Sequence, residues 1–378
     1  MAVRILAPPH YLAAPMTQPA TGRAVLFTGF PGFIGARLLV RLLKDDPELR
    51  AFALVEPRMV GRAREAAAAI SERIVIEPGD ITDARLGLTE TRYRELADTV
   101  TSVMHLAAIY DLAVPAAVAE AVNVNGTRHV LDFCRSCKRL ERHHYVSTAY
   151  VAGRRTGRVL ESELDVGQSF KNHYESTKYG AEVLVRASMP ATPTTIYRPA
   201  VVVGDSRTGE TQKFDGPYYI LRFIALLSQL RVPVPQLASE TATFNAVPVD
   251  FIVDAIAAGV RDSRMVGETL HLVDPAPVAA AELLRLLARS YAGKSLRYRV
   301  PSGIVERALK HDLVRRLVAN TPQETVQYLN HPVTFDTTRA TALLAEHGVR
   351  CPRFPDYVDN LVAFFRAHER DPAFGAKR

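Results

Sequence analysis

The sequence predicts an α/β protein, built on a doubly wound parallel sheet and completed by a smaller, mostly helical C-terminal region. Two observations predict this fold. From residue 24 to residue 204, short apolar segments alternate with helical segments, which is typical of a parallel sheet covered on both faces. After Gly204 the pattern changes to a turn-rich polar stretch and then to mainly helical segments. The chain of 378 residues is long enough for both regions.

Six apolar segments are expected to form the strands before Gly204. They are AVLFT from residue 24, AFALVEP from 51, RIVIEPGD up to Asp80, TSVMHLAA at 101–108, HHYVSTAY at 143–150 and TTIYRPAVVVG at 194–204. The expected helices follow the first strand up to residue 44, and lie at about 60–72, over NVNGTRHVLDFCRSC and around Tyr174. This alternation predicts parallel strands joined by crossover helices.

Downstream of Gly204 the expected elements are more varied. PYYILRFIALLSQL predicts an apolar helix, NAVPVDFIVDAIAAGV predicts a strand followed by a helix, and ETLHLV at 268–273 predicts a further strand. The remaining hundred or so residues are expected to be mostly helical.

Composition and charge narrow the classes of function. The formal charge is +7, but the basic residues are spread along the chain and thicken only modestly between 297 and 316, so no nucleic-acid partner is predicted. Anionic small molecules, an acidic carrier protein or a lipid surface remain compatible with this charge. No segment reaches the roughly 18 uninterrupted apolar residues of a membrane span, so none is predicted.

Two further features are expected to carry no chemistry. Residues 1–22 contain several prolines, and Pro8 and Pro9 interrupt any run resembling a signal peptide, which predicts a loose leader. Cys134 and Cys137 form a C-x-x-C inside an expected helix, without the second ligand pair of a metal site, so we interpret them as incidental thiols and predict no metal. A reducing compartment fits this use of cysteine, and we predict a cytoplasmic location.

The turn after the first strand gives the first sign of a ligand. TGFPGFIG places Gly29, Gly32 and Gly35 at G-x-x-G-x-x-G spacing between a strand and a helix. Glycines let the backbone turn tightly and approach a pyrophosphate, and the helix N-terminus directs unpaired N–H groups at the anion. The sequence therefore predicts a Rossmann-type dinucleotide site. The alternative is a tight turn that binds nothing.

The ends of the second and third strands bear on the choice of cofactor. Glu56 lies about twenty residues beyond Gly35, where a carboxylate accepts from the ribose hydroxyls of NAD. Arg58 and Arg62 follow, and either can meet the 2′-phosphate of NADP, so the balance slightly favours NADP as a usable cofactor. Asp80 can accept from the adenine amino group, or can cap a following helix.

The segment KNHYESTKYGAE pairs a phenol with an ammonium. Tyr174 and Lys178 are four residues apart and share one face of a helix. The lysine is expected to lower the phenol's pKa from its usual value near 10, so that Tyr174 can protonate a carbonyl oxygen that accepts a hydride. Thr148 can hydrogen-bond the same oxygen. Taken singly, each residue is more often a helix tyrosine, a solvated lysine or a hydroxyl that caps a loop.

Several short motifs occur together in order: TGFPGFIG, GDITD, HLAA, NVNGT, VSTAYVAG, YESTK and YRPAVVVG, over residues 24–204. On these motifs the chain resembles the extended short-chain dehydrogenase/reductases. Downstream, GDSRTG and FNAVPVDFIVDAI resemble the thioester-reductase and fatty-acyl-reductase branch more than the sugar-nucleotide epimerases. The resemblance implies an NAD(P)-binding Rossmann domain and a Thr-Tyr-Lys catalytic set.

The resemblance also implies individual roles. Thr148, Tyr174 and Lys178 match the catalytic set, Lys178 also reaches the nicotinamide ribose, and Asn125 of NVNGT supports a proton path. The implied cofactor residues are Gly29, Gly32, Phe33, Ile34 and Gly35 at the pyrophosphate, Asp80 and Ile81 at adenine, Leu106, Ala107 and Ala108 at the ribose, and Pro199 and Val202 at the nicotinamide. Phe30 and Pro31 depart from the family's loop, and Pro31 lacks an N–H to offer a phosphate.

Three functions remain open. The first is an NAD(P)-dependent oxidoreductase acting on a carbonyl or alcohol. The expected substrate is either an acyl thioester, linked to CoA or to an acyl carrier, or an aldehyde. The second is a sugar-nucleotide epimerase or dehydratase, which needs the same cofactor but a polar pocket. The third is a non-catalytic NAD(P)-sensing protein, which would be expected to lose the Tyr–Lys pair.

The predicted organisation has three parts. Residues 1–22 form the leader, residues 23–205 with 245–275 form the NAD(P)-binding domain, and residues 206–244 with 276–378 form a substrate-binding cap. Within the cap, PYYILRFIALLSQL is either an apolar wall for an acyl chain or an ordinary core helix. The basic, amphipathic segment 301–320 either docks on a lipid surface or an acyl carrier, or packs on the protein. The family resemblance also suggests a homodimer.

Overall fold

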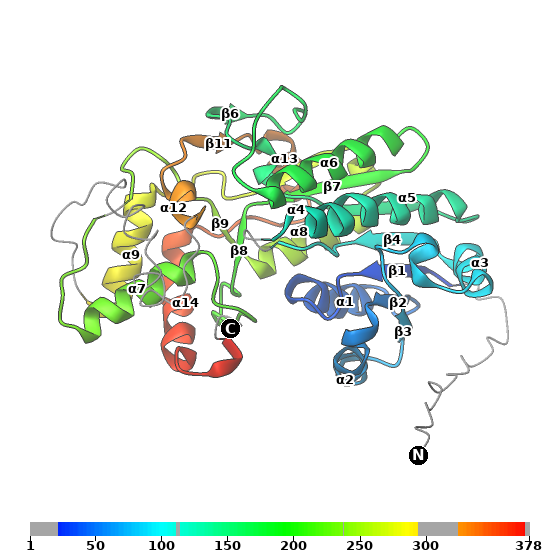
Figure 1. Ribbon diagram of the computed structural model, residues 1–378, viewed down its shortest axis with the longest axis horizontal. Helices are drawn as coiled ribbons and strands as arrows, with labels where there is room; N and C mark the ends of the chain where they lie inside the picture. The colour runs from blue at the N-terminus through cyan, green and yellow to red at the C-terminus, as the bar shows by residue number, and fades with distance from the viewer. Residues whose placement is uncertain (1–21, 111–113, 237, 294–323, 375–378) are drawn as a thin grey trace, which may run out of the picture.

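A seven-stranded parallel sheet forms the centre of the computed structural model, which describes residues 22–110, 114–236, 238–293 and 324–374 (Figure 1). The strands lie in the order β10-β7-β5-β4-β1-β2-β3, and each neighbouring pair is parallel. Their bounds are β1 Ala24–Thr28, β2 Arg50–Val55, β3 Ile74–Pro78, β4 Ser102–His105, β5 Arg142–Val146, β7 Thr194–Pro199 and β10 Thr269–Leu272. The predicted doubly wound sheet is confirmed, and ETLHLV supplies its edge strand β10.

Helices cover both faces of this sheet, because successive strand residues point to opposite faces. Val25 and Phe27 of β1 pack into one cluster, whereas Ala24 and Leu26 pack into another. The first face is covered by α1 Phe33–Asp45, α2 Val60–Ile70, α8 Val249–Arg261 and α13 Thr338–Ala345. The second face is covered by α3 Glu90–Thr99, α5 Gly126–Ser136 and α6 His173–Ser188.

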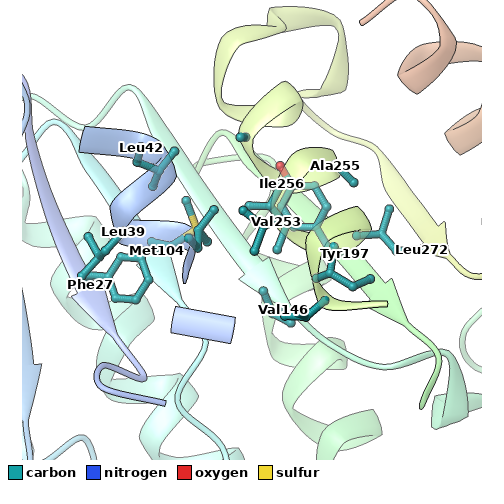
Figure 2. Packing of buried hydrophobic residues seen from close by; sticks show 14 of the residues in the cluster. Phe27, Leu39, Leu42, Met104, Val146, Tyr197, Val253, Ala255, Ile256 and Leu272 are labelled. Carbon is teal, nitrogen blue, oxygen red and sulfur yellow. The ribbon is translucent and has the colours of Figure 1, made fainter. Parts of the chain in front are cut away.

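The largest apolar cluster fixes the first face of the sheet. In Figure 2, Phe27 and Met104 of neighbouring strands lie beside Leu39 of α1, and Val253 and Ile256 of α8 continue the cluster toward β7. Full burial of each large apolar side chain contributes roughly 1.5–3 kcal/mol. The strands are therefore held firmly, and the positions at which they end are well defined.

Three helices form a second apolar cluster at one end of the molecule, away from β1, β2 and β3 (Figure 1). They are α7 Pro217–Gln229, α9 Ala280–Ala292 and α14 Phe354–His368. Tyr218, Leu221 and Ile224 of α7 are buried in this cluster, so one side of the predicted apolar helix packs as an ordinary core helix. Tyr219 and Phe223 are half-buried.

The remaining elements are short. β6 Gly157–Val159 pairs with β11 Val333–Phe335, and β8 Val201–Val203 pairs with β9 Ala246–Pro248. The short helical segments are η1 Pro57–Met59, η2 Ala84–Gly87, α4 Ala116–Ala119, the π-helical η3 Glu120–Asn125, η4 Ala149–Ala152, η5 Ser263–Met265, α12 Glu324–Leu329 and η6 Pro372–Phe374. The pairing of β6 with β11 was not predicted, because strands of three residues carry too little periodicity to recognise.

The strands of the central sheet all fall within the predicted ranges 23–205 and 245–275. The segment 333–345 departs from the predicted cap, since β11 pairs with β6 and α13 packs against the sheet cluster. We therefore propose a division in which α7, α9 and α14 form the cap and 333–345 returns to the sheet. The predicted leader, apart from Gly22, and the segment 301–320 lie outside the described residues.

Candidate active site

The glycine loop lies where the strand order reverses, between β1 and β4. Thr28 ends β1 opposite His105, which ends β4. The Thr28 hydroxyl oxygen accepts hydrogen bonds from the backbone N–H groups of Leu106 at 3.2 Å and Ala107 at 3.1 Å. This contact brings the HLAA motif beside the glycine loop, at the carboxyl edge where open α/β sheets bind their ligands.

The three glycines of TGFPGFIG are required by close backbone contacts. Gly29 has φ of 93°, and a Cβ there would lie 2.9 Å from the Leu106 Cβ. A Cβ on Gly32 or Gly35 would lie 2.7 or 2.5 Å from the Gly29 carbonyl oxygen. Helix α1 begins at Phe33, directly after Gly32, with no side chain capping its N-terminus and no acidic residue in its first turn. The loop therefore fits a diphosphate group, which binds open helix N-termini.

The residues expected at the adenosine half of the cofactor lie at the ends of β2 and β3. Glu56 and Arg58 form an ion pair of 2.5 Å, with their side chains 40% and 77% exposed. Arg62 is exposed on α2. The Asp80 carboxylate accepts from the Thr82 N–H and hydroxyl, both at 2.8 Å, so it closes a turn. The alternative of a helix N-cap is wrong for Asp80, because the short helix η2 begins after Asp83.

The other expected cofactor residues lie along the same edge. Ile81 is buried and its carbonyl accepts from the His129 ring at 2.8 Å. Pro199 is buried at the end of β7. The half-buried members of this group are Phe33, Ile34, Leu106, Ala107, Ala108 and Val202.

Helix α6 begins with a reciprocal cap formed by its own side chains. The Asn172 side chain accepts from the Glu175 N–H at 3.0 Å, and the Glu175 carboxylate accepts from the Lys171 N–H at 2.9 Å. The same carboxylate accepts from the Lys171 ammonium at 3.3 Å and from the Tyr328 hydroxyl of α12 at 2.7 Å. These bonds fix the first helical turn, and Tyr174 lies within it.

Tyr174 and Thr148 meet beside the end of β7. Thr148 follows β5, and its hydroxyl is close enough to the Tyr174 phenol to influence that phenol's pKa. The Thr148 hydroxyl lies 3.4 Å from the Pro199 carbonyl oxygen, to which it donates. Burial raises the pKa of Tyr174 to about 12, although the Thr148 hydroxyl opposes this shift. The phenol therefore stays protonated at neutral pH.

Lys178 lies on the same helix but contacts a different phenol. Its ammonium donates to the Tyr145 hydroxyl at 2.9 Å and to the Val146 carbonyl oxygen at 2.8 Å. Burial lowers the pKa of Lys178 to about 7, while the negative charge of Glu182 opposes that shift. The expectation that Lys178 lowers the pKa of Tyr174 is wrong, because desolvation dominates at both groups and the lysine is hydrogen-bonded elsewhere.

Buried polar groups lie between Lys178 and the glycine loop. The Tyr145 hydroxyl, which accepts from Lys178, is close enough to the Thr127 hydroxyl for Thr127 to influence its pKa, and the Thr127 hydroxyl lies 3.1 Å from one ring nitrogen of His105. The other ring nitrogen of His105 lies 2.8 Å from the Thr28 hydroxyl. Burial and the Lys178 charge hold the pKa of His105 well below its ordinary value, so the ring is neutral. The lysine and the glycine loop thus share one rigid interior.

Asn123, rather than Asn125, faces the interior of the NVNGT motif. The Asn125 side chain accepts from Arg128 at 2.9 Å on the outer side, so its predicted position near the proton path is wrong. The Asn123 amide bonds the Ile109 N–H and carbonyl at 2.9 and 3.0 Å and donates to the Thr177 hydroxyl at 3.0 Å. Asn123 and Thr127 share one helical face, a spacing that could have identified Asn123 from the sequence.

Three further findings concern the two cysteines, metal binding and membrane spans. Burial raises the pKa of the Cys134 thiol well above its ordinary value and that of Cys137 to about 12, which disfavours thiolates at this C-x-x-C. Among the residues that the structure describes, no three His, Cys, Asp or Glu side chains are grouped to hold a metal ion. In the same residues, no helix has the length and apolar composition that crossing a membrane requires.

With this geometry in view, similarity to known proteins identifies the family. Residues 27–256 match the NAD-binding family model described as "Male sterility protein". The chain belongs to this family. It is an extended short-chain dehydrogenase/reductase of the thioester-reductase-like branch, as the sequence motifs implied. The prediction of an NAD(P)-dependent oxidoreductase is thereby confirmed at the level of the family.

Individual relatives agree with this assignment. The terminal R domain of the myxalamid PKS-NRPS biosynthetic pathway is 27% identical to this chain, with a TM-score of 0.78. The structural alignment covers 94% of this chain and 92% of the R-domain chain. Glycine betaine reductase ATRR of Emericella nidulans is 30% identical over 68% of this chain. UDP-glucuronic acid 4-epimerase of Bacillus cereus, solved with NAD, is 18% identical over 93% of this chain and its whole length, with a TM-score of 0.63, and shares the fold.

The chain spans only a small part of the curated relatives that it matches. It covers 21% of glycine betaine reductase ATRR, and between 5% and 28% of the first relatives. Those relatives contain long segments that have no counterpart in this chain.

Proposed function

We propose that the protein reduces the carbonyl group of an acyl thioester or aldehyde with NAD(P)H. The observation that carries the proposal is the closeness of the Thr148 hydroxyl to the buried Tyr174 phenol, beside the end of β7 at the carboxyl edge of the sheet. Membership of the thioester-reductase-like branch supports the substrate class. The residues that would hold the cofactor are the glycine loop and the predicted residues at the ends of β2, β3, β4 and β7.

In the proposed reaction, Thr148 and Tyr174 hold the substrate carbonyl oxygen between their hydroxyl groups. The bound nicotinamide supplies the hydride. As negative charge develops on the oxygen, Tyr174 donates its proton to it. With a pKa of about 12, Tyr174 is protonated at neutral pH and so has a proton to donate. Lys178 would bind the nicotinamide ribose hydroxyls, and Asn123 would hold the loop after β4 against helix α6.

We propose that NADP(H) is a usable cofactor alongside NAD(H). Glu56 favours the ribose hydroxyls of NAD(H). Arg58 forms an ion pair with Glu56, but its side chain, like that of Arg62, is exposed to solvent. An arginine beside the 2′-phosphate would neutralise its charge. A comparison of Michaelis constants for NADH and NADPH tests this choice, and a large preference for NADH would contradict it.

The substrate class is tested by incubating the full chain with NADH or NADPH and panels of acyl thioesters, aldehydes and sugar nucleotides. Net oxidation of the cofactor with an acyl compound, bound to CoA or to an acyl carrier, is the expected result. A sugar product formed without net oxidation would favour the epimerase alternative. Binding of cofactor without any turnover would favour the non-catalytic alternative. The predicted cytoplasmic location and homodimer stay predictions.

A further inference from the structure

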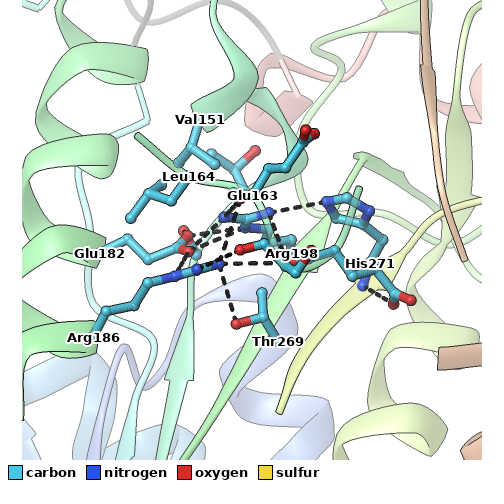
Figure 3. Close-up of polar contacts among 12 residues, drawn as sticks. Val151, Glu163, Leu164, Glu182, Arg186, Arg198, Thr269 and His271 are labelled. Carbon is cyan, nitrogen blue, oxygen red and sulfur yellow. Dashed lines mark hydrogen bonds and ion pairs between the residues drawn. The ribbon is translucent and has the colours of Figure 1, made fainter. Parts of the chain in front are cut away.

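A completely buried carboxylate on helix α6, that of Glu182, lies at the centre of a polar network. Figure 3 shows Glu182 facing Arg186 and Arg198, with His271 beyond. The Arg198 guanidinium contacts Glu182 through its Nη2 at 2.7 Å and through its Nε at 3.1 and 3.2 Å. The Ser147 hydroxyl donates to the same carboxylate at 2.6 Å, and the Arg186 Nε donates to it at 3.1 Å.

Two partners of Glu182, Ser147 and Arg198, adjoin residues of the proposed site. Ser147 immediately precedes Thr148, and Arg198 immediately precedes Pro199, whose carbonyl accepts from Thr148. Glu182 itself lies one helical turn after Lys178 on α6. A single carboxylate therefore connects the end of β5, which leads to Thr148, with α6, which carries Tyr174 and Lys178, and with β7, whose Pro199 carbonyl accepts from Thr148.

The orientation of the Arg198 guanidinium is fixed by its hydrogen bonds. A guanidinium has five N–H donors, and those of Arg198 all find acceptors in Glu182, the Glu163 and Glu161 carbonyls and His271. The distances to Glu163 and His271 are 2.8 and 3.2 Å. Burial lowers the pKa of His271 to about 4, so its ring is neutral and accepts from Arg198.

Such a network is unusual in a core. Desolvation of two charges can outweigh their attraction, so a buried ion pair is often no more stabilising than apolar side chains of similar volume. Glu182 and Arg198 are nonetheless completely buried. Their retention fits a role in fixing geometry and charge rather than in adding stability.

We propose that Glu182 is a positioning residue, which sets the placement of Thr148 relative to Tyr174 and Lys178 through Ser147, Arg198 and helix α6. Its negative charge also favours the ammonium form of Lys178, one helical turn away on α6, against the opposing effect of burial. The groups that act electrostatically with Lys178 are Tyr145 on β5, Glu182 on α6 and His105 on β4. Of these three groups, Glu182 is the one whose negative charge favours the charged form of Lys178. This inference rests on the proposed function for its kinetic part.

The first test is Glu182→Gln, which keeps the shape and removes the charge. We expect kcat to fall by about tenfold or more, since small misplacements of reacting groups have such effects, while KM and cofactor affinity change little. For wild type, kcat/KM should decline as pH rises through about 7, where Lys178 loses its proton. In Glu182→Gln this decline should begin at lower pH, because the charge that favours the ammonium is gone.

A second measurement does not depend on turnover. The Lys178 side chain, labelled with ¹⁵N and assigned with a Lys178→Met variant, can be titrated by NMR in wild type and in Glu182→Gln. The midpoint should fall in the variant. An unchanged midpoint would overturn the electrostatic role. If the wild-type protein reduces no acyl compound, the proposed function is contradicted. The difference in the Lys178 midpoint between wild type and Glu182→Gln would still test the electrostatic role of Glu182.

Two variants separate positioning from stability. Ser147→Ala removes one hydroxyl and no charge, so it should fold, lower kcat by several-fold and leave the Lys178 midpoint nearly unchanged. Glu77→Gln removes another buried carboxylate, which pairs with Arg92 between β3 and α3, elements that carry none of Thr148, Tyr174 and Lys178. It should lower stability without changing kcat or the pH profile. Wild-type kcat in both Glu182→Gln and Ser147→Ala would overturn the positioning role.

Discussion

Helices α1 and α6 both begin at the carboxyl edge of the sheet, but their first turns are built in opposite ways. The first turn of α1 has no capping side chain and no acidic residue. The first turn of α6 is closed by Asn172 and Glu175, and the Glu175 carboxylate is completely buried. An uncapped N-terminus can accept a diphosphate, whereas a capped one holds its own side chains rigidly. The two helices therefore have different roles. Helix α1 presents backbone N–H groups, and helix α6 presents the side chains of Tyr174 and Lys178.

The largest effect is expected from the side chain that α6 presents. Tyr174→Phe should lower kcat by roughly 10²–10⁴-fold, because it removes the proton donor while keeping the ring. Cofactor affinity, measured by calorimetry, should stay nearly unchanged, since α1 and its loop are untouched. Retained turnover would remove Tyr174 from its proposed role, and loss of cofactor binding would contradict the division between the two helices.

A smaller effect, on binding rather than on chemistry, is expected from the backbone of α1. Gly35→Ala places a Cβ 2.5 Å from the Gly29 carbonyl oxygen, a backbone atom that can move only if the loop moves. Overpacking of this kind costs about 1–3 kcal/mol, so calorimetry should find cofactor affinity lower by about tenfold or more.

Gly61→Ala is the matched control for Gly35→Ala. Gly61 lies on the exposed side of α2, and a Cβ there would meet no atom within 4 Å. Cofactor affinity should not change in this variant, and stability should rise slightly because alanine favours the helix. Equal affinities in the two variants would show that the glycine loop does not hold the cofactor.

The glycine loop and the strands could be predicted from the sequence because the signals are local. Gly29, Gly32 and Gly35 are required by contacts within a few residues of one another and with the neighbouring HLAA motif. Strand β1, AVLFT, and most of β2, RAFALV, are apolar because they are buried on both faces. By contrast, the return of α13 to the sheet depends on pairing between β11 and β6, which are far apart in the chain.

The catalytic helix was predictable in position but not in electrostatics. YESTK located Tyr174 and Lys178 on one helix, and the structure brings Thr148 to the phenol. The pKa shifts were not predictable, because they depend on burial and on contacts from other elements, such as Tyr145 on β5. Glu182 and Arg198 look like ordinary surface charges in the sequence, and only packing makes them a buried pair.

An intermediate effect is expected from the loop that α6 holds. Asn123→Ala removes the amide that joins Ile109 to Thr177, and should lower kcat by several-fold as the loop after β4 loosens. Asn125→Ala removes only an outer contact with Arg128 and should leave kcat unchanged. Steady-state kinetics on both variants compare the two positions. A larger loss in Asn125→Ala would restore the interpretation from the sequence and contradict the structure.

The smallest effect is expected from the cap of α6 itself, and it tests whether that cap serves the site or only the helix. Asn172→Ala removes the acceptor for the Glu175 N–H and the donor to the Tyr328 hydroxyl. Loss of an N-cap lowers the free energy of unfolding by about 1 kcal/mol, and urea unfolding can measure it. Thr89→Ala removes the corresponding cap of α3, where the Thr89 hydroxyl accepts from Arg92, and should destabilise similarly. Only Asn172→Ala should also lower kcat, by roughly two- to tenfold, because Tyr174 lies in the turn that Asn172 closes. Equal kcat in the two variants would mean that the cap stabilises α6 without positioning its phenol.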